Sequence, residues 1–153
     1  MTELELDVNG VVRTVIADPA TPLLLVLRND LGLTAAKLGC ALEQCRACAV
    51  LVDGVATTSC ATPVESMVGK RIVTPEGLGT PERLHRVQRA FVDEQATQCG
   101  YCIPGMVVGA VALLERTPSP TDAEIRESLA GHLCRCGSQP RILAAVRRAA
   151  AGR

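Results

Sequence analysis

The chain has 153 residues, enough for one ordinary domain or two small ones, because domains commonly contain about 50 to 200 residues. Hydrophobic residues make up 48% of the chain but aromatic residues only 1%, so any core must be built from aliphatic side chains. Sixteen basic residues balance sixteen acidic ones, and this balance disfavours binding to nucleic acid or to an anionic membrane surface.

The hydropathy of the chain and its first residues indicate whether it would span a membrane or be exported. No stretch approaches the roughly 18 apolar residues of a membrane-spanning helix, and the first residues, "MTELELDVNG", show no basic region followed by an apolar run. We therefore expect no membrane span and a cytoplasmic location, unless the chain is exported with a partner that bears a signal. Eight cysteines in such a chain favour metal binding, since reducing compartments keep thiols reduced.

The first 17 residues predict a β-hairpin. Apolar and polar residues alternate over 4–8 and again over 11–15, and Asn9-Gly10 between them is typical of a type I′ turn. Thr21 and Pro22 then predict the start of a short helix through "LLLVLRND", with the hydroxyl as cap and the proline at the first helical position. This helix is expected to pack on the sheet.

Two further strands and a closing strand complete the predicted sheet. The apolar run "CAVLV" is followed by an Asp53-Gly54 turn and a second short strand. Residues 71–74 close the sheet. The stretch "TPEGLGTPERL" then breaks the pattern with several glycines and prolines, and it predicts a domain boundary: residues 1–75, a linker over 76–81, and residues 82–153.

The second half predicts four short helices. Thr80-Pro81 is taken as the start of the first, and apolar residues recur at helical spacing over 84–91 and 106–114. Thr121 with Glu124 forms a capping box for the third, and Ser138-Pro140 introduces the fourth, whose last turns are basic. The expected fold class is therefore α+β, a small sheet domain followed by a four-helix bundle.

The first cysteine set has the spacing of a plant-type [2Fe-2S] site, in which four thiolates hold two irons. Small residues such as Gly39 and Ala47 allow the loop backbone to approach the cluster sulfurs. The alternative is a structural zinc site, which usually has two Cys-x-x-Cys pairs, whereas this set has one. The set consists of Cys40, Cys45, Cys48 and Cys60.

The second cysteine set combines a Cys-x-x-Cys pair with a Cys-x-Cys pair about thirty residues later, and it uses every remaining cysteine. Zinc is a stronger alternative here, because Cys-x-Cys is not diagnostic. A Rieske centre needs two histidine ligands, and neither histidine lies in such a pattern. Each pair precedes a predicted helix, where the helix dipole favours an anionic cluster. The set consists of Cys99, Cys102, Cys134 and Cys136.

The motifs together resemble the small iron–sulfur subunit of the molybdenum hydroxylases, the xanthine dehydrogenase and aldehyde oxidoreductase family. The resemblance is carried by "GCALEQCRACAVLVDG", "PEGLG", "EQATQCGYCIPGMV", "PTDAEIRESLAGHLCRCG" and "PRI", and it runs from residue 3 to residue 148. The tail "CRCGSQPRI" is similar to the branch with the small subunits of isoquinoline 1-oxidoreductase and nicotinate dehydrogenase. That branch implies a nitrogen heteroaromatic or aldehyde substrate.

The resemblance implies a β-grasp, ferredoxin-like domain followed by a four-helix bundle, each with one [2Fe-2S] cluster. A large partner subunit would hold molybdenum on a pterin cofactor and perform the hydroxylation, so this chain would carry no catalytic residue. Electrons would pass from the pterin to the proximal cluster in the bundle, then to the distal cluster held by the first cysteine set, and on to a flavin subunit or a cytochrome c. Gln98 and Cys136 would lie nearest the pterin.

The sequence departs from the family pattern at two positions. Family members usually have glycine at Arg46 and asparagine at His132. His132 has two interpretations, a hydrogen bond to cluster sulfur or bonds to carbonyls at a helix end. Arg46 also has two: a fixed cation that stabilises the reduced distal cluster, or a surface residue that docks the acceptor.

The first interpretation of Arg46 gives a measurable prediction. Because a fixed cation stabilises the added electron, Arg46→Gly is expected to lower the potential of the distal cluster and leave that of the proximal cluster unchanged in a redox titration. An unchanged distal potential would favour the docking role.

Two other classes of function stay open at this point. A freestanding two-cluster ferredoxin is one, although such carriers usually have a strong net charge and this chain has none. A zinc-stabilised interaction module is the other, and it would be colourless with zinc in place of iron.

Overall fold

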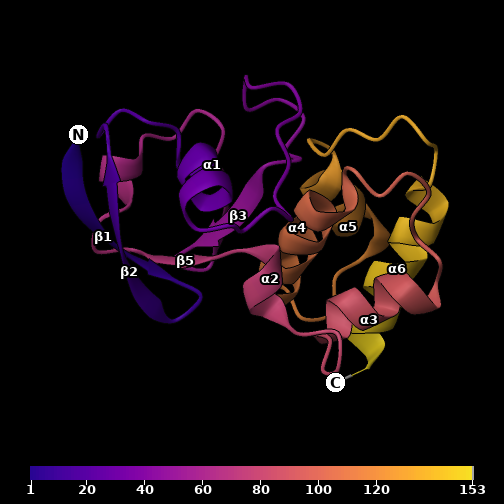
Figure 1. The fold of residues 1–153 in the computed structure, drawn as a ribbon. Coiled ribbons are helices and arrows are strands. Elements are labelled where there is room, and N and C mark those ends of the chain that lie inside the picture. Colours follow the sequence, from indigo (N-terminus) through magenta and orange to yellow (C-terminus); the bar gives the residue numbers. More distant parts are fainter. Residues whose placement is uncertain (153) are drawn as a thin grey trace.

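The computed structural model describes residues 1–152, and it shows two units side by side (Figure 1). A five-stranded sheet with one short helix forms the first unit, and a group of helices forms the second. This is the α+β arrangement that the sequence predicts, with the sheet first and the helices after it.

The sheet has the strand order β2-β1-β5-β3-β4, in which β1 and β5 are parallel and the other pairs are antiparallel. Asn9 and Gly10 both have positive φ, 57° and 76°, so the predicted type I′ turn between the first two strands is confirmed. The strands are β1 (Thr2–Val8), β2 (Val11–Ala17), β3 (Ala49–Val52), β4 (Val55–Thr58) and β5 (Arg71–Val73).

A short helix covers one face of this sheet, as expected. It consists of α1 (Leu23–Leu25) and a π-helical turn, η1 (Val26–Asp30), and most of its apolar side chains are fully buried. The expected cap is wrong by one position: Pro22 itself precedes the helix, and no side chain caps the helix start. A 3-10 turn, η2 (Val64–Met67), lies between β4 and β5.

Strand β3 is buried on both faces, which explains its continuous apolar run. Val50 and Val52 belong to the core beneath α1, whereas Ala49 and Leu51 belong to the core of the helical unit. If apolar and polar residues alternated along β3, polar side chains would be buried in one of these two cores. The two units therefore share a packed boundary, which we call the domain seam.

Helix α2 (Pro75–Leu78) overlaps the segment predicted as a linker, residues 76–81, and hydrogen bonds at the start of this helix attach it to the first unit. The Asn9 side chain accepts a hydrogen bond from the Thr74 backbone N–H at 2.9 Å and donates to the Thr74 hydroxyl at 3.0 Å. The Glu76 carboxylate accepts a hydrogen bond from the backbone of Ala35 at 2.8 Å. The domain limits themselves stay a prediction.

The helical unit contains α3 (Arg86–Asp93), α4 (Ile103–Arg116), α5 (Asp122–Leu129) and α6 (Gln139–Ala151). The predicted capping box of α5 is confirmed, since Thr121 and Glu124 exchange hydrogen bonds at 2.7 and 3.3 Å. The helix start predicted at Thr80-Pro81 is wrong. Helix α3 begins after His85, which forms its own capping box with Gln88.

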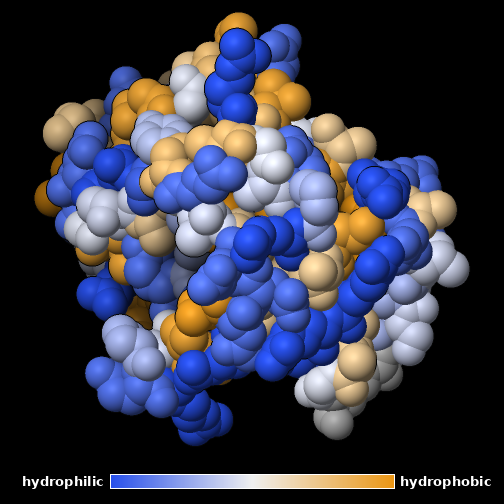
Figure 2. Space-filling model, turned by 90° about the vertical axis from the view of Figure 1, so that its right-hand side faces the viewer, coloured by the Kyte–Doolittle hydropathy of each residue, from blue (hydrophilic) through white to orange (hydrophobic). Residues whose placement is uncertain are grey.

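Helix α4 is the central helix of this unit, almost wholly buried, and it packs against α3 and α5 and against strand β3. Figure 2 shows that the outer side of the helical unit is mostly hydrophilic, with apolar residues confined to narrow stretches. Within residues 1–152, no helix is both long enough and apolar enough to cross a membrane.

Candidate metal centres

The loop that holds the first three cysteines directs backbone N–H groups at sulfur. The Sγ atom of Cys40 accepts hydrogen bonds from the backbone N–H groups of Leu42, Gln44 and Cys45, each at 3.3 Å. The N–H groups of Cys45 and Leu42 lower the pKa of the Cys40 thiol to about 7. Because the thiolate is the form that binds metal, this loop favours the metal-binding form of Cys40 even before a metal is present.

This hydrogen bonding requires an unusual backbone. Ala41, Glu43 and Arg46 all have positive φ, between 56° and 60°, a conformation that few residues other than glycine adopt. Such strain costs on the order of 1 kcal/mol per residue and tends to occur at functional sites. Gly39 is required for a different reason, because a β-carbon there would lie 2.5 Å from the Sγ atom of Cys45.

The other two thiols of the first set form a buried pair. Cys48 and Cys60 are 1% and 7% exposed, and their side chains are hydrogen-bonded to each other. Burial, reinforced by this hydrogen bond, raises the pKa of the Cys48 thiol to about 11. The Ser59 hydroxyl donates to the Cys48 carbonyl at 2.6 Å, which holds the Cys60 segment against the loop.

The second set lies where two helices begin, as the sequence predicts. Cys102 precedes α4, while Cys134 and Cys136 lie in the loop that leads into α6. Burial, with a contribution from Cys134, raises the pKa of the Cys102 thiol to about 12. Burial also opposes the Cys134 thiolate, but hydrogen bonds from Ser138 and Cys136 outweigh it and lower that pKa to about 7.

The thiols approach one another in pairs. Side-chain hydrogen bonds join Cys40 to Cys45, Cys48 to Cys60, Cys99 to Cys136, and Cys102 to Cys134. In the part of the chain that the structure describes, no three or more histidine, cysteine or acidic side chains are arranged to hold a single metal ion. A [2Fe-2S] cluster takes two thiolates on each of its irons, so two pairs in each set fit such a cluster.

Direct hydrogen bonds across the domain seam connect the two sets. The backbone N–H of Leu133 donates to the carbonyl of Cys45 at 3.2 Å, and the hydroxyl of Tyr101 donates to the carbonyl of Leu38 at 2.7 Å. A cavity of about 240 Å³ lies between the sets, lined by thiols of both. The lining cysteines are Cys40, Cys45, Cys99, Cys102 and Cys134.

Tyr101→Phe is expected to weaken the domain seam. The change removes one hydroxyl, and a typical hydrogen bond of this kind contributes about 0.5–1 kcal/mol to stability. Thermal unfolding followed by circular dichroism should show a fall in Tm of roughly 1–4 °C. An unchanged Tm would mean that water replaces the hydroxyl at the Leu38 carbonyl without loss.

Comparison with known proteins gives the same two units. The family described as "2Fe-2S iron-sulfur cluster binding domain" matches residues 6–71, and the family described as "[2Fe-2S] binding domain" matches residues 74–147. A nicotinate dehydrogenase subunit of Pseudomonas putida is 54% identical over 97% of this chain and 95% of its own length. The alpha subunit of isoquinoline 1-oxidoreductase of Brevundimonas diminuta is 46% identical, covering 84% of each chain.

The chain belongs to the small [2Fe-2S] subunits of the molybdenum hydroxylases. Solved structures agree: quinoline 2-oxidoreductase from Pseudomonas putida 86 superimposes with a TM-score of 0.93 at 35% identity, over 98% of this chain and 94% of that one. The aldehyde oxidoreductase from Desulfovibrio gigas gives a TM-score of 0.94 at 38% identity over 99% of this chain, which corresponds to 17% of that longer chain.

Membership establishes the general role. The chain is an iron–sulfur electron-transfer subunit of a molybdenum-containing oxidoreductase, it binds two [2Fe-2S] clusters, and it works with a large molybdenum subunit. The family match therefore excludes the freestanding ferredoxin and the zinc module.

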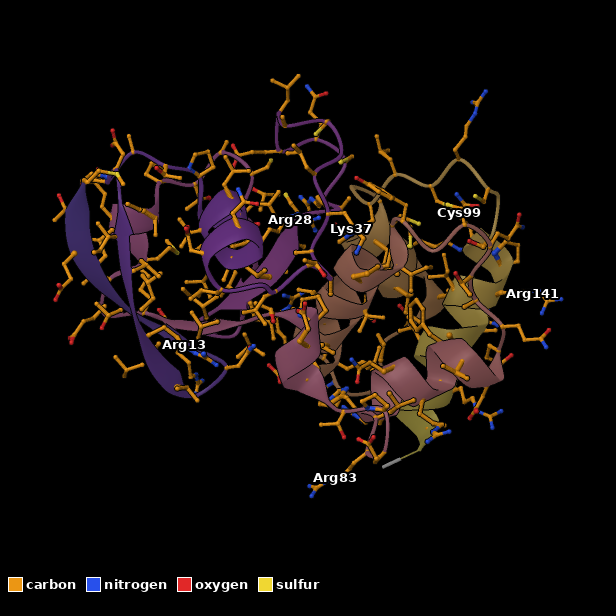
Figure 3. All side chains as sticks on the ribbon, viewed as in Figure 1. Arg13, Arg28, Lys37, Arg83, Cys99 and Arg141 are labelled. Atoms are coloured by element: carbon orange, nitrogen blue, oxygen red, sulfur yellow. The ribbon has the colours of Figure 1, made fainter. Side chains whose placement is uncertain are left out.

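The remaining residues singled out from the sequence differ in their surroundings. Gln98 and Cys99 are exposed beside each other, and Figure 3 shows Cys99 at the edge of the helical unit. Sequence reasoning missed the seam contacts made by Tyr101 and Leu133. Only a lone tyrosine between two ligand cysteines marked Tyr101, and nothing marked the backbone donor at Leu133.

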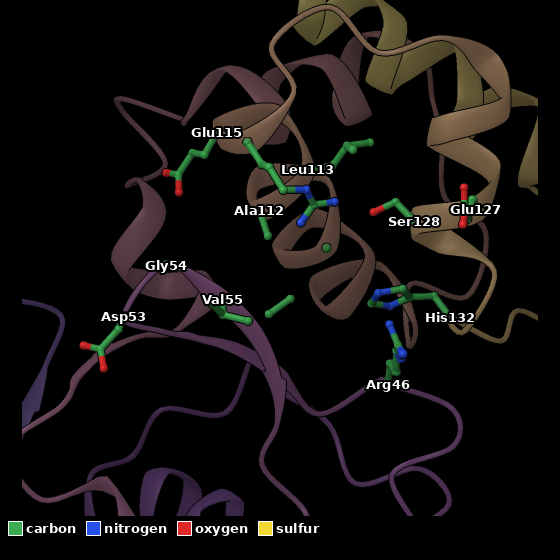
Figure 4. A pocket seen from close by; sticks show the side chains of 13 residues that line it. Arg46, Asp53, Gly54, Val55, Ala112, Leu113, Glu115, Glu127, Ser128 and His132 are labelled. Carbon is green, nitrogen blue, oxygen red and sulfur yellow. The ribbon is translucent and has the colours of Figure 1, made fainter.

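Arg46 and His132 lie together at the seam (Figure 4), beside a cavity of about 410 Å³ between the β3–β4 turn and α4. His132 is 7% exposed, and burial together with the Arg46 charge lowers its pKa to about 4. Within residues 1–152 its ring makes no hydrogen bond to a helix-end carbonyl, so that interpretation has no support here, and Nδ1 is unpartnered. The predicted effect of Arg46 on the distal potential stays a prediction.

Proposed function

We propose that Cys99, Cys102, Cys134 and Cys136 hold the proximal cluster, which receives electrons from the pterin of the large subunit. The first cysteine set holds the distal cluster, which passes them to a flavin subunit or a cytochrome c. The single observation that supports this order best is a difference in exposure: the second set contains one exposed thiol, Cys99, and one buried thiol, Cys102, whereas the first set contains two buried thiols, Cys48 and Cys60, and no exposed one.

The apolar surface around the second set supports contact with the large subunit there. Tyr101 is 49% exposed and Leu133 is 60% exposed, and both lie on the loops that hold the second set. Large apolar side chains exposed on ligand loops are typical of an interface that excludes water from a cofactor. Gln98 and Cys136 lie on the same loops, next to the position proposed for the pterin.

The residues of this chain hold the two clusters in position. When bound, the two clusters supply two one-electron centres, which together accept the pair of electrons released in one turnover. The backbone N–H groups at Cys40 stabilise negative charge on sulfur, and the dipole of α4 favours an anionic group at Cys102. The hydrogen bonds across the seam hold the two ligand loops at a fixed separation.

The relatives support a nitrogen heteroaromatic as the substrate of the complete enzyme, in preference to an aldehyde. Relatives at 54%, 46% and 44% identity are named for nicotinate, isoquinoline and nicotine, whereas the aldehyde oxidoreductase subunit of Escherichia coli is 40% identical.

Reduction of the purified heteromer tests the substrate class. Nicotinate or isoquinoline should bleach the iron–sulfur absorption anaerobically, and an aromatic aldehyde should do so more slowly. Faster bleaching by the aldehyde would reverse the assignment. A complex that dithionite bleaches but none of the three reduces would place the substrate in another class.

A further inference from the structure

Arg46 and His132 are side chains from different domains that meet between the two ligand loops. Arg46 follows Cys45 directly, and His132 lies two residues before Cys134. Figure 4 shows the guanidinium of Arg46 beside the imidazole of His132. The two residues lie 86 positions apart in the sequence, so the fold alone brings them together.

Two glycines of the helical unit make room for these side chains. A β-carbon at Gly131 would lie 2.6 Å from Nε and 2.8 Å from Cζ of Arg46. A β-carbon at Gly109 would lie 2.6 Å from Nε2 of His132. Approaches this close mean that both side chains pack directly against the backbone of the helical unit, and a larger residue at either glycine would have to displace them.

The two side chains differ in burial. His132 is 7% exposed, whereas Arg46 is exposed and forms no ion pair within residues 1–152. An arginine in this position keeps its charge in water while its methylene stem covers an apolar or neutral neighbour. Glu43 and Glu127 line the cavities next to Arg46, but neither carboxylate forms an ion pair with its guanidinium within residues 1–152.

We propose that the contact between Arg46 and His132 positions the two ligand loops relative to each other and thereby sets the separation of the two clusters. The proposal rests on the ligand sets proposed above. The hydrogen bond from the Leu133 N–H to the Cys45 carbonyl lies beside this contact, since Leu133 follows His132 and Cys45 precedes Arg46. Side chains and backbone therefore hold the same two loops together.

The test uses the assembled heteromer with Arg46→Gly, His132→Asn and the double variant. Hydrogen exchange at the Leu133 amide should become about fivefold to tenfold faster in each single variant, because the loops separate more often. The magnetic splitting between the two reduced clusters in low-temperature EPR spectra should change as well. In both measurements the double variant should show a change no larger than that of the stronger single variant, since each substitution removes the same contact.

Two further variants separate positioning from other effects. Arg46→Lys, which keeps the charge and the stem, should retain most of the slow exchange, whereas Arg13→Gly, which removes an exposed arginine on β2 (Figure 3), should change neither readout. Native exchange and splitting in both single variants, or effects that add in the double variant, would overturn the proposal. Both [2Fe-2S] signals intact after Cys102→Ala or Cys48→Ala would instead contradict the ligand assignment, which the hydrogen-exchange measurement does not require.

Discussion

Cys102→Ala is expected to leave the distal cluster reducible by dithionite but no longer by substrate. The Cys102 thiol is buried at the start of α4 and is paired with Cys134, so its loss leaves one iron of the proximal cluster with a single thiolate. If the proximal cluster lies between the pterin and the distal cluster, its loss interrupts the transfer. Anaerobic reduction followed by EPR, with iron content falling by about half, measures both effects.

Cys48→Ala is the matched variant for the other site. Cys48 is likewise buried and paired, with Cys60, so the distal cluster should be lost while the proximal cluster remains. Substrate and dithionite should then both reduce the remaining cluster, and electron delivery to an external acceptor should fall. Reduction of the distal cluster by substrate in Cys102→Ala would show that the proposed order is reversed or that the clusters are reduced independently.

Local sequence rules predicted most of the elements, because short-range chemistry decides them. The turn at Asn9-Gly10 needs two residues that tolerate positive φ, and the capping box of Thr121 and Glu124 needs two side chains three residues apart. The thiol spacing predicted both ligand sets, and the assignment of each set to a cluster stays a proposal. The turn and the capping box depend only on residues that are close in the sequence.

The failed predictions arose where two local signals competed. Thr80-Pro81 resembles a helix start, but the Thr80 hydroxyl accepts a hydrogen bond from the Arg83 backbone within a turn at 3.2 Å. His85 and Gln88 cap the helix five residues later instead. A histidine is a rarer cap than threonine, so propensity alone favours the wrong start.

The domain seam could not be predicted from the sequence, because its contacts join residues far apart in the chain. The contact between Arg46 and His132 spans 86 positions, and neither residue has a local pattern that indicates a partner. The donor at Leu133 is a backbone group, which every residue except proline possesses. Residues at such a seam become recognisable only when the fold brings the two loops together.

Gly105→Ala is expected to destabilise the subunit, although glycine to alanine in a helix ordinarily stabilises it by about 1 kcal/mol. A β-carbon at Gly105 would overlap the carbonyl oxygen of Arg46 and would lie 3.2 Å from the Cα atom of Ala47. Both are backbone atoms of the loop that carries Cys45 and Cys48, so neither can move away by a change of rotamer as a side chain can. Overpacking of this kind typically costs about 1–3 kcal/mol.

Thermal unfolding of the subunit should therefore show a lower Tm for Gly105→Ala, by roughly 2–12 °C. The distal EPR signal should change as well, because the displaced loop holds its ligands. Gly109→Ala is the matched control on the same helix: its β-carbon would meet the side chains of His132 and Leu129, at 2.6 and 3.2 Å, which can move. Gly109→Ala should therefore lower the Tm less than Gly105→Ala does. In a His132→Asn background the loss of Tm caused by Gly109→Ala should become smaller still, whereas the loss caused by Gly105→Ala should stay the same. A Tm for Gly105→Ala equal to or above the native value would mean that α4 and the ligand loop do not pack as closely as the structure shows.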